Sequence, residues 1–331
     1  MATFEIEGPG APVVESTRVD LITPRARTWG AIRAVLAVIV TVIVLIPVIW
    51  MIMTAFKPRA ASVASPPVVF VKPSLEGFIG LLTQTNILPE AGLAEYQKRT
   101  DLGFFDRIAL EGGMAIIGPS QYVERLRASV IIAGFSTFAS VALGLLAAYA
   151  FSRFNIPGKD DWLFFILSTR MLPPVVVTIP IFLMYRSLGL YDTYGGMILL
   201  YTVFNLSFSV WLLKGFIDEI PREYEEAALV DGYSRLQAFR KVVLPQAMTG
   251  IAAAIVFCLI FAWNEYAFAL MVTSENARTS PPFIIAKMGS GSVEWHTIAA
   301  STLMFLIPVV VVTFALRKHL LRGVTFGAIR Q

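Results

Sequence analysis

The chain has 331 residues, of which 56% are hydrophobic and only 15% are charged, and its mean hydropathy is +0.69. Soluble domains carry about 25% charged residues, so this composition excludes an ordinary soluble protein and indicates a polytopic membrane protein. The formal net charge is +4. Basic residues at the cytoplasmic ends of membrane spans account for this charge without a nucleic-acid partner.

Cysteine and histidine are too few to build a metal site or a disulfide framework. The one cysteine, Cys258, lies inside an apolar run, and the histidines His296 and His319 pair neither with each other nor with cysteines. Zinc sites need clusters of such ligands at short spacing. We therefore expect no bound metal.

The chain begins with a polar, proline-containing segment, residues 1–30, which we expect to be a cytoplasmic tail. The apolar run that follows is longer than the ~7–15 residues of a signal peptide. It also reaches the ~20 residues that a helix needs to cross about 30 Å of hydrocarbon. Residues 31–56 are therefore predicted to form a first transmembrane helix.

Five further apolar segments predict membrane spans. They are residues 128–151, 162–185, 195–216, 247–272 and 297–316. The second of these five contains Pro173, Pro174 and Pro180, so we expect a kinked or broken helix there. The predicted fold class is an all-α polytopic membrane protein with six transmembrane helices, whose core is residues 128–316.

Loop charges predict the orientation. Lysine and arginine gather in the N-terminal tail, in the connections after the second and fourth spans, and in residues 317–331. Because such residues accumulate on the cytoplasmic side, both termini and residues 217–246 are expected in the cytoplasm. The long loop 57–127 is then extracytoplasmic, and its stretches 74–82 and 91–111 are expected to form short amphipathic helices.

The connection between the fourth and fifth spans contains "EYEEAALVDGYSRLQAFRKVVLPQ", residues 223–246, with seven charged side chains. Pro221 suits the first turn of a helix, and Gly232 predicts its end. Ser234 and Gln237 form the S-x-x-Q pattern of a capping box and predict a second helix. Two apolar faces are expected, from Tyr224, Ala227 and Ala228 in the first helix and from Leu236, Phe239 and Val243 in the second.

A lipid-bound helix is the alternative interpretation of this segment. Such helices are rich in lysine and arginine on their polar face, whereas the first helix here carries Glu223, Glu225 and Glu226. Acidic side chains fit poorly against an anionic inner leaflet. The small side chains of Ala227 and Ala228 favour close approach by another protein.

The same residues carry a family resemblance. Glu226-Ala227-Ala228, Gly232 and Val242-Val243-Leu244-Pro245 stand at the spacing E-A-A-x3-G-x9-I-x-L-P, with Val242 in place of isoleucine. This pattern resembles the EAA loop of bacterial ABC importer permeases. Further stretches, such as "NIPGKDDW", "FAWNEYAFAL" and "RGVTFGAIRQ", resemble the carbohydrate-type permeases related to the smaller membrane subunit of the maltose transporter. The resemblance fails over about 85–120, where we expect an insertion.

The resemblance implies a permease subunit in the bacterial inner membrane that works by alternating access. Its implied partners are an ABC ATPase dimer, a second homologous permease and an extracytoplasmic solute-binding protein. No G-x-x-x-x-G-K-[ST] phosphate loop occurs in the chain, so ATP and Mg²⁺ are expected to be used by the ATPase partner and no cofactor by this chain. The implied ATPase-coupling residues are Glu226, Ala227, Ala228, Asp231, Gly232, Arg235, Leu244 and Pro245.

Polar and aromatic residues inside the spans are candidates for a translocation pathway. They are Arg170, Tyr201, Phe204, Asn205, Trp263, Asn264 and Glu265. Ionisable residues in hydrocarbon are costly and usually face a cavity or a partner. The alternatives are interhelical hydrogen bonds, aromatic packing, and an ion pair between Arg170 and Glu265.

The expected function is import of a sugar or sugar-alcohol-like solute. Another polar solute, such as glycerol phosphate or an amino acid, remains an alternative. An ion-driven secondary transporter usually shows two similar halves, and none is visible in this sequence. An intramembrane hydrolase is also disfavoured, because the chain has no G-x-S-x-G motif.

Overall fold

The computed structural model describes residues 24–99, 101–288 and 293–327, and it divides into two compact units, residues 1–50 and 51–331. The described residues of the first unit all belong to helix α1 (Pro24–Ala55), and its side chains from Trp29 to Trp50 are exposed. An apolar helix without an apolar core around it fits a lipid environment. α1 agrees with the predicted first span, and residues 1–23 of the expected tail lie outside the described residues.

The second unit contains three more helices long and apolar enough to cross a membrane, α6 (Tyr122–Arg153), α9 (Tyr194–Asp218) and α16 (Trp295–Gly327). Two bent pairs of helices also qualify by length and composition. The first joins α7 (Lys159–Ser168), with its 3₁₀ turn Thr169–Met171, to α8 (Pro174–Ser187) at 92°. The described residues therefore give four single spans, and six in all where each bent pair counts as one.

The second bent pair begins in the connection between the fourth and fifth predicted spans. Residues 235–246, which include α11 (Arg235–Ala238), a π-helical turn (Phe239–Val243) and α12 (Leu244–Gln246), meet α13 (Met248–Trp263) at 73°. α10 (Glu223–Val230) precedes them.

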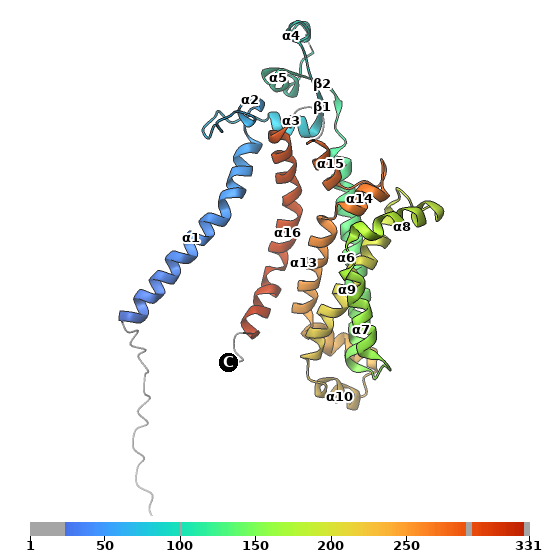
Figure 1. Cartoon of the computed structure of the whole chain (residues 1–331). Helices are drawn as coiled ribbons and strands as arrows, with labels where there is room; N and C mark the ends of the chain where they lie inside the picture. The colour runs from blue at the N-terminus through green and yellow to red at the C-terminus, as the bar shows by residue number, and fades with distance from the viewer. Residues whose placement is uncertain (1–23, 100, 289–292, 328–331) are drawn as a thin grey trace, which may run out of the picture. The chain divides into compact units, whose positions relative to one another are not determined.

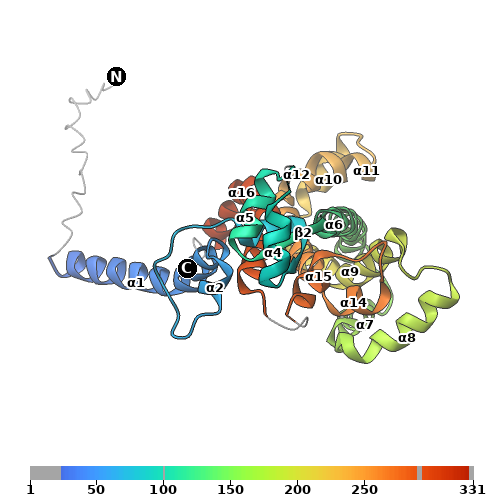
Figure 2. The same ribbon diagram turned by 90° about the horizontal axis from the view of Figure 1, so that it is seen from above.

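Close helix packing builds the centre of the second unit. α6 lies along α9, and α13 packs against α6, α9 and α16; Figure 2 looks down α6, with α9 beside it. Most buried residues of α6 are small, and a Cβ added at Gly144 would collide with the Ser209 side chain of α9. Small residues let helix backbones approach closely in membranes.

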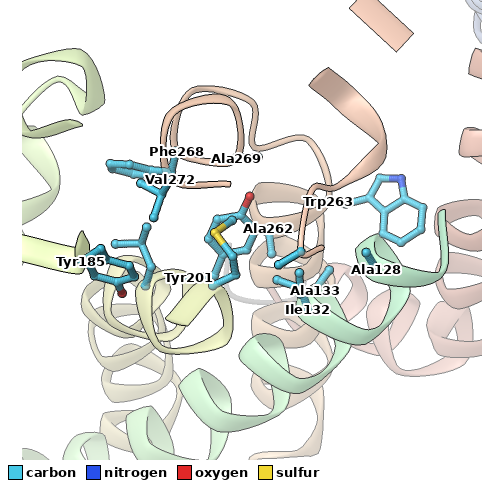
Figure 3. Packing of buried hydrophobic residues seen from close by; sticks show 13 residues of the cluster. Ala128, Ile132, Ala133, Tyr185, Tyr201, Ala262, Trp263, Phe268, Ala269 and Val272 are labelled. Atoms are coloured by element: carbon cyan, nitrogen blue, oxygen red, sulfur yellow. The ribbon is translucent and has the colours of Figure 1, made fainter. Parts of the chain in front are cut away.

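Two buried clusters follow from this packing. One joins Tyr185 of α8, Tyr201 of α9 and Phe268, with Trp263 near Ala128 of α6 (Figure 3). The other joins Leu213 and Cys258 to Phe239 and Val243 beside α10. The second cluster therefore connects the membrane helices with residues 223–246.

The break in the third predicted span is confirmed, and the fifth predicted span, 247–272, is also interrupted, which the sequence did not indicate. α13 ends at Trp263, and a separate short helix, α14 (Ala267–Val272), follows. The Glu265 carboxylate accepts the backbone N–H groups of Phe268 (2.8 Å) and Ala269 (3.0 Å). Because the first N–H groups of a helix lack intrahelical partners, this carboxylate fixes a new helix start.

The loop that is predicted to be extracytoplasmic folds into a small subdomain at the end of the unit opposite α10 (Figure 1). Its helices are α2 (Arg59–Ser62), α3 (Glu76–Leu82), α4 (Glu90–Gln97) and α5 (Phe104–Glu111). The short helices expected in 74–82 and 91–111 are present. The all-helical prediction missed an antiparallel hairpin of β1 (Thr83–Ile87) and β2 (Met114–Pro119), in which Ile87 pairs with Met114.

The remaining elements complete the outer and C-terminal parts. α15 (Ser280–Ala286) contacts α6 and α16. α16 continues to Gly327, so the helix extends into the predicted tail 317–331. Residues 328–331 lie outside the described residues.

Candidate functional site

Residues 223–246, called the elbow below, form the candidate site at the end of the second unit that is predicted to face the cytoplasm. α10 begins at Glu223 with Arg222 as its N-cap, so Pro221 stands just before the helix rather than in its first turn. Glu223, Glu225 and Glu226 occupy the first turn. Their negative charge complements the positive end of the helix dipole.

Gly232 ends α10 as the sequence predicts. Its φ is +88°, and its N–H donates to the Leu229 carbonyl at 3.1 Å. The Tyr233 N–H donates to the Ala228 carbonyl at 3.0 Å. These two bonds form a Schellman motif, in which the residue after the helix adopts the left-handed conformation that favours glycine.

The second helix of the elbow starts with the predicted capping box. The Gln237 N–H donates to Ser234 Oγ at 3.3 Å, and the Ser234 N–H donates to Gln237 Oε1 at 2.7 Å. These bonds satisfy donors that a helix start leaves free. The elbow is thus a helix, a left-handed glycine and a capped second helix.

Exposure separates two faces of α10. Tyr224, Glu226 and Ala227 are exposed, whereas Glu225 and Ala228 are buried. The predicted face of Tyr224, Ala227 and Ala228 is therefore wrong, because helical rotation sends Ala228 inward. In the second helix Phe239 and Val243 are buried and Leu236 is exposed.

The structure places most of the predicted coupling residues at the surface of the elbow. Glu226, Ala227, Asp231, Gly232 and Pro245 are exposed. Ala228 is buried and Leu244 half-buried. Arg235 is exposed, with its guanidinium 5.5 Å from the centre of the Phe154 ring.

Sequence reasoning missed the residues that hold the elbow to the membrane helices. The Glu225 carboxylate forms an ion pair with Arg153 at the end of α6, and the two side chains are 9% and 7% exposed. Tyr149 Oη donates to Glu225 Oε2 at 3.0 Å. The sequence offers three glutamates in one turn and no signal for which of them points inward.

Tyr201 and Glu265 contact each other within the predicted membrane spans. Tyr201 belongs to α9, and Glu265 lies in the break between α13 and α14. Tyr201 Oη donates to Glu265 Oε2 at 2.7 Å. Tyr201 is buried and Glu265 half-buried. Together with the bonds from Phe268 and Ala269, this contact favours the interhelical alternative for Glu265.

None of the ion pairs among the described residues joins Arg170 to Glu265. The Arg170 guanidinium instead lies 4.1 Å from the ring centre of Phe261, 5.3 Å from that of Phe204 and 5.1 Å from that of Phe208. Such cation–π contacts are attractive. Arg170 and Phe204 also line a cavity of about 300 Å³ beside the α7–α8 break.

Asn205, Trp263 and Asn264 bond within the helix packing. Asn205 Nδ2 donates to the Cys258 carbonyl at 3.2 Å, and Trp263 Nε1 donates to the Phe305 carbonyl at 3.1 Å. Both side chains are buried, whereas the Asn264 side chain is exposed and donates to the Ile260 carbonyl at 2.8 Å. For Asn205 and Trp263 these contacts favour a structural role, and the assignment of the seven residues to a pathway stays a prediction.

A second site that sequence reasoning missed is Asp192, in the outer connection between α8 and α9. Its carboxylate accepts backbone N–H groups from Ser274, Asn276 and Ala277 at 2.9 to 3.1 Å. Burial alone raises the pKa of Asp192, but these bonds outweigh burial and lower it to about 2. The residue has a φ of +55° and ties the α8–α9 connection to the segment after α14.

The model of a protein family, described as "Binding-protein-dependent transport system inner membrane component", matches residues 140–326. The trehalose transport system permease protein SugB of Mycobacterium tuberculosis is 37% identical over 205 residues, which are 61% of this chain and 75% of SugB. The trehalose/maltose transport system permease protein MalG of Thermococcus litoralis is 27% identical over 296 residues, 89% of this chain and 94% of MalG.

Solved structures share the fold. One is a bacterial ABC transporter involved in the import of the acidic polysaccharide alginate, with a TM-score of 0.60 and 21% identity over 89% of this chain and 98% of that chain. Another is the MetNI methionine ABC transporter, with a TM-score of 0.50 and 20% identity over 60% of this chain and 94% of that chain.

Proposed function

Because the chain belongs to the family of binding-protein-dependent transport system inner membrane components, we propose that it is one of two unlike permease subunits of a bacterial ABC importer that carries a sugar. It lies in the inner membrane and receives its solute from an extracytoplasmic binding protein. A separate ATPase dimer supplies ATP hydrolysis with Mg²⁺.

The exposed face of α10 is the observation that carries this proposal. Glu226 and Ala227 are exposed on the face of α10 that lies away from the buried Glu225 and Ala228. The helix lies at the opposite end of the unit from the outer subdomain (Figure 1). An acidic, small-residue face on a capped helix suits docking into a cleft of another protein, with Glu226 paired to a basic residue.

The mechanism depends on how the elbow is attached to the membrane helices. The ATPase subunits close when they bind ATP, and a docked elbow moves with them. Nucleotide changes the solute pathway only when it binds the two conformations with different affinity. The elbow must therefore be fixed to the membrane helices, and its second helix runs through the π-helical turn and α12 into α13.

The sugar assignment is supported by the relatives. Trehalose, trehalose/maltose and diacetylchitobiose permeases are among them. The diacetylchitobiose permease of Streptomyces coelicolor is matched over 92% of this chain. A second permease subunit is part of the proposal because one such chain supplies half of a pathway.

The Glu226→Lys variant tests the function. In vesicles that contain both permeases, the ATPase and the binding protein, we expect ATP-dependent uptake of a radiolabelled disaccharide such as trehalose to be lost while membrane insertion stays normal. Glu219→Lys, also at an exposed cytoplasmic position, is the matched control and should transport. Normal uptake by Glu226→Lys, with wild-type attachment of the ATPase, would show that the elbow does not couple transport.

A further inference from the structure

The buried side chains of α10 are Glu225 and Ala228, and Glu225 follows the exposed Tyr224 and precedes the exposed Glu226. Consecutive residues of a helix point about 100° apart, so the same turn offers one carboxylate to solvent and one to the protein interior. The inward carboxylate uses both oxygens. Oε1 accepts from Arg153 Nε, and Oε2 accepts from Tyr149 Oη.

Both partners of Glu225 lie on one face of α6. Tyr149 and Arg153 are four residues apart and therefore one turn apart on the same side. The Tyr149 ring also packs against Phe239 of the π-helical turn, with 4.7 Å between ring centres. Tyr149 thus contacts the parts of the elbow both before and after Gly232.

The last turn of α6 makes further bonds to the chain just before α10. Arg153 donates to the Ile220 carbonyl at 2.9 Å, and Arg222 donates to the Ser152 carbonyl at 2.8 Å. Ser152 also donates to the Asp218 carboxylate at the end of α9. Consequently the ends of α6 and α9 and the start of α10 share one bonded network.

Within this network the Glu225–Arg153 pair is buried, and burial opposes its separation. When one partner of a buried ion pair moves away, the other is left as an uncompensated charge in the interior. A displacement of α10 that separated Glu225 from Arg153 would therefore be unfavourable. A displacement that carries α6 along keeps the pair intact, and α6 packs along α9 and against α13.

We propose that the Glu225–Arg153–Tyr149 contact is the link through which movement of the elbow reaches α6 and the other membrane helices. Glu225 and Arg153 are positioning residues: they face away from the docking surface and act through the helix that they hold. This inference rests on the proposed docking of the ATPase at the elbow, and it adds a second connection to the covalent one through α12 and α13.

The test uses the complete importer in proteoliposomes with its binding protein, and it measures solute uptake and ATP hydrolysis in the same sample. Glu225→Gln removes the charge and keeps the shape. We expect it to retain the ATPase subunits and hydrolyse ATP, but to transport about tenfold less solute per ATP, within the roughly 5–150-fold range of typical coupling free energies. Tyr149→Phe removes a single hydrogen bond and should shift the ratio in the same direction by less.

Glu219→Gln provides the matched control, because this exposed glutamate lies in the same cytoplasmic connection. Its ratio of transport to hydrolysis should equal that of the wild type. An unchanged ratio in Glu225→Gln would overturn the inference. Loss of assembly in Glu225→Gln together with a normal ratio in Tyr149→Phe would also overturn it, because the contact would then serve folding alone.

The two proposals fail in different ways. If the ATPase does not dock on the elbow, the Glu226→Lys variant will keep both its ATPase subunits and its uptake. Failure of the link appears only in the ratio of transport to hydrolysis for Glu225→Gln and Tyr149→Phe.

Discussion

At the residue scale, three carboxylates fix contacts between elements of this permease. Glu225 joins the elbow to α6, Glu265 starts α14, and Asp192 binds the backbone of residues 274–277. Each carboxylate accepts several hydrogen bonds, and bonds to charged groups are the stronger ones. Polar contacts therefore fix the relative positions of these elements, which non-directional apolar packing alone does not specify.

Asp192→Asn gives a prediction at this scale. Asparagine tolerates a positive φ, so the change removes the charge without a new backbone strain. Because the backbone N–H groups then face a weaker acceptor, we expect the free energy of unfolding to fall by about 1–2 kcal/mol. Thermal unfolding of the purified protein in detergent measures this difference.

The pH dependence of the same variant has a definite sign. The pKa of Asp192 is lowered to about 2 in the folded protein, below its value of about 3.9 in an unfolded chain. Its stabilising contribution is therefore complete above about pH 4 and is lost as the pH falls toward 2. A stability difference between wild type and Asp192→Asn that grew on acidification would contradict this assignment.

The residues show why the candidate site was predictable only in part. The E-A-A-x3-G pattern, the glycine stop and the capping box depend on local spacing, and the structure contains the glycine stop and the capping box. Tyr149, which bonds to Glu225, and Tyr201, which bonds to Glu265, lie on helices more than 60 residues away in the chain. Local patterns carry no information on such contacts.

At the scale of elements, proline and side-chain caps decide where the membrane helices break. The α7–α8 break was predictable because Pro173 and Pro174 stand at its centre. The α13–α14 break was not, because residues 247–272 read as one apolar run and only the folded chain brings Glu265 to Tyr201. The β1–β2 hairpin was missed for a similar reason, since α4 and α5 separate its strands in the sequence.

Gly232→Ala gives a prediction for the elbow. A Cβ at this position meets no atom within 4 Å, so the cost comes from the left-handed φ alone and should be about 1–2 kcal/mol. We expect weaker coupling of ATP hydrolysis to uptake at nearly normal protein level. Ser234→Ala is the control for stability, since losing the cap costs about 1 kcal/mol without changing the glycine.

Equal coupling in Gly232→Ala and in the wild type would show that the turn geometry of the elbow does not matter. A similar loss in Ser234→Ala and Gly232→Ala would instead assign the effect to helix stability.

At the scale of the whole molecule, the second unit places a folded subdomain at one end and the elbow at the other (Figure 1). The subdomain has its own small core, in which Ile79, Ala109 and Met114 are buried together. Around it Phe104, Phe105 and Ile117 remain exposed. We propose that this surface contacts the binding protein.

Removal of α4 and α5 tests that proposal. A short turn in place of residues 88–113 joins β1 directly to β2, which pair from Ile87 to Met114. We expect normal membrane insertion and normal attachment of the ATPase, but loss of the stimulation of ATP hydrolysis by the binding protein. Undiminished stimulation and uptake in this variant would argue against the contact.

The central claim, that the ATPase docks on α10 from the cytoplasm, can be measured directly by cross-linking. The chain has one cysteine, Cys258, and it is buried, so a cysteine introduced at the exposed Ala227 is the reactive one. In the assembled importer, Ala227→Cys should cross-link to the ATPase subunit through a short thiol–amine reagent, whereas Gly118→Cys in the outer hairpin should not. No cross-link at Ala227, or labelling of Ala227→Cys by an impermeant reagent added outside intact cells, would contradict the account.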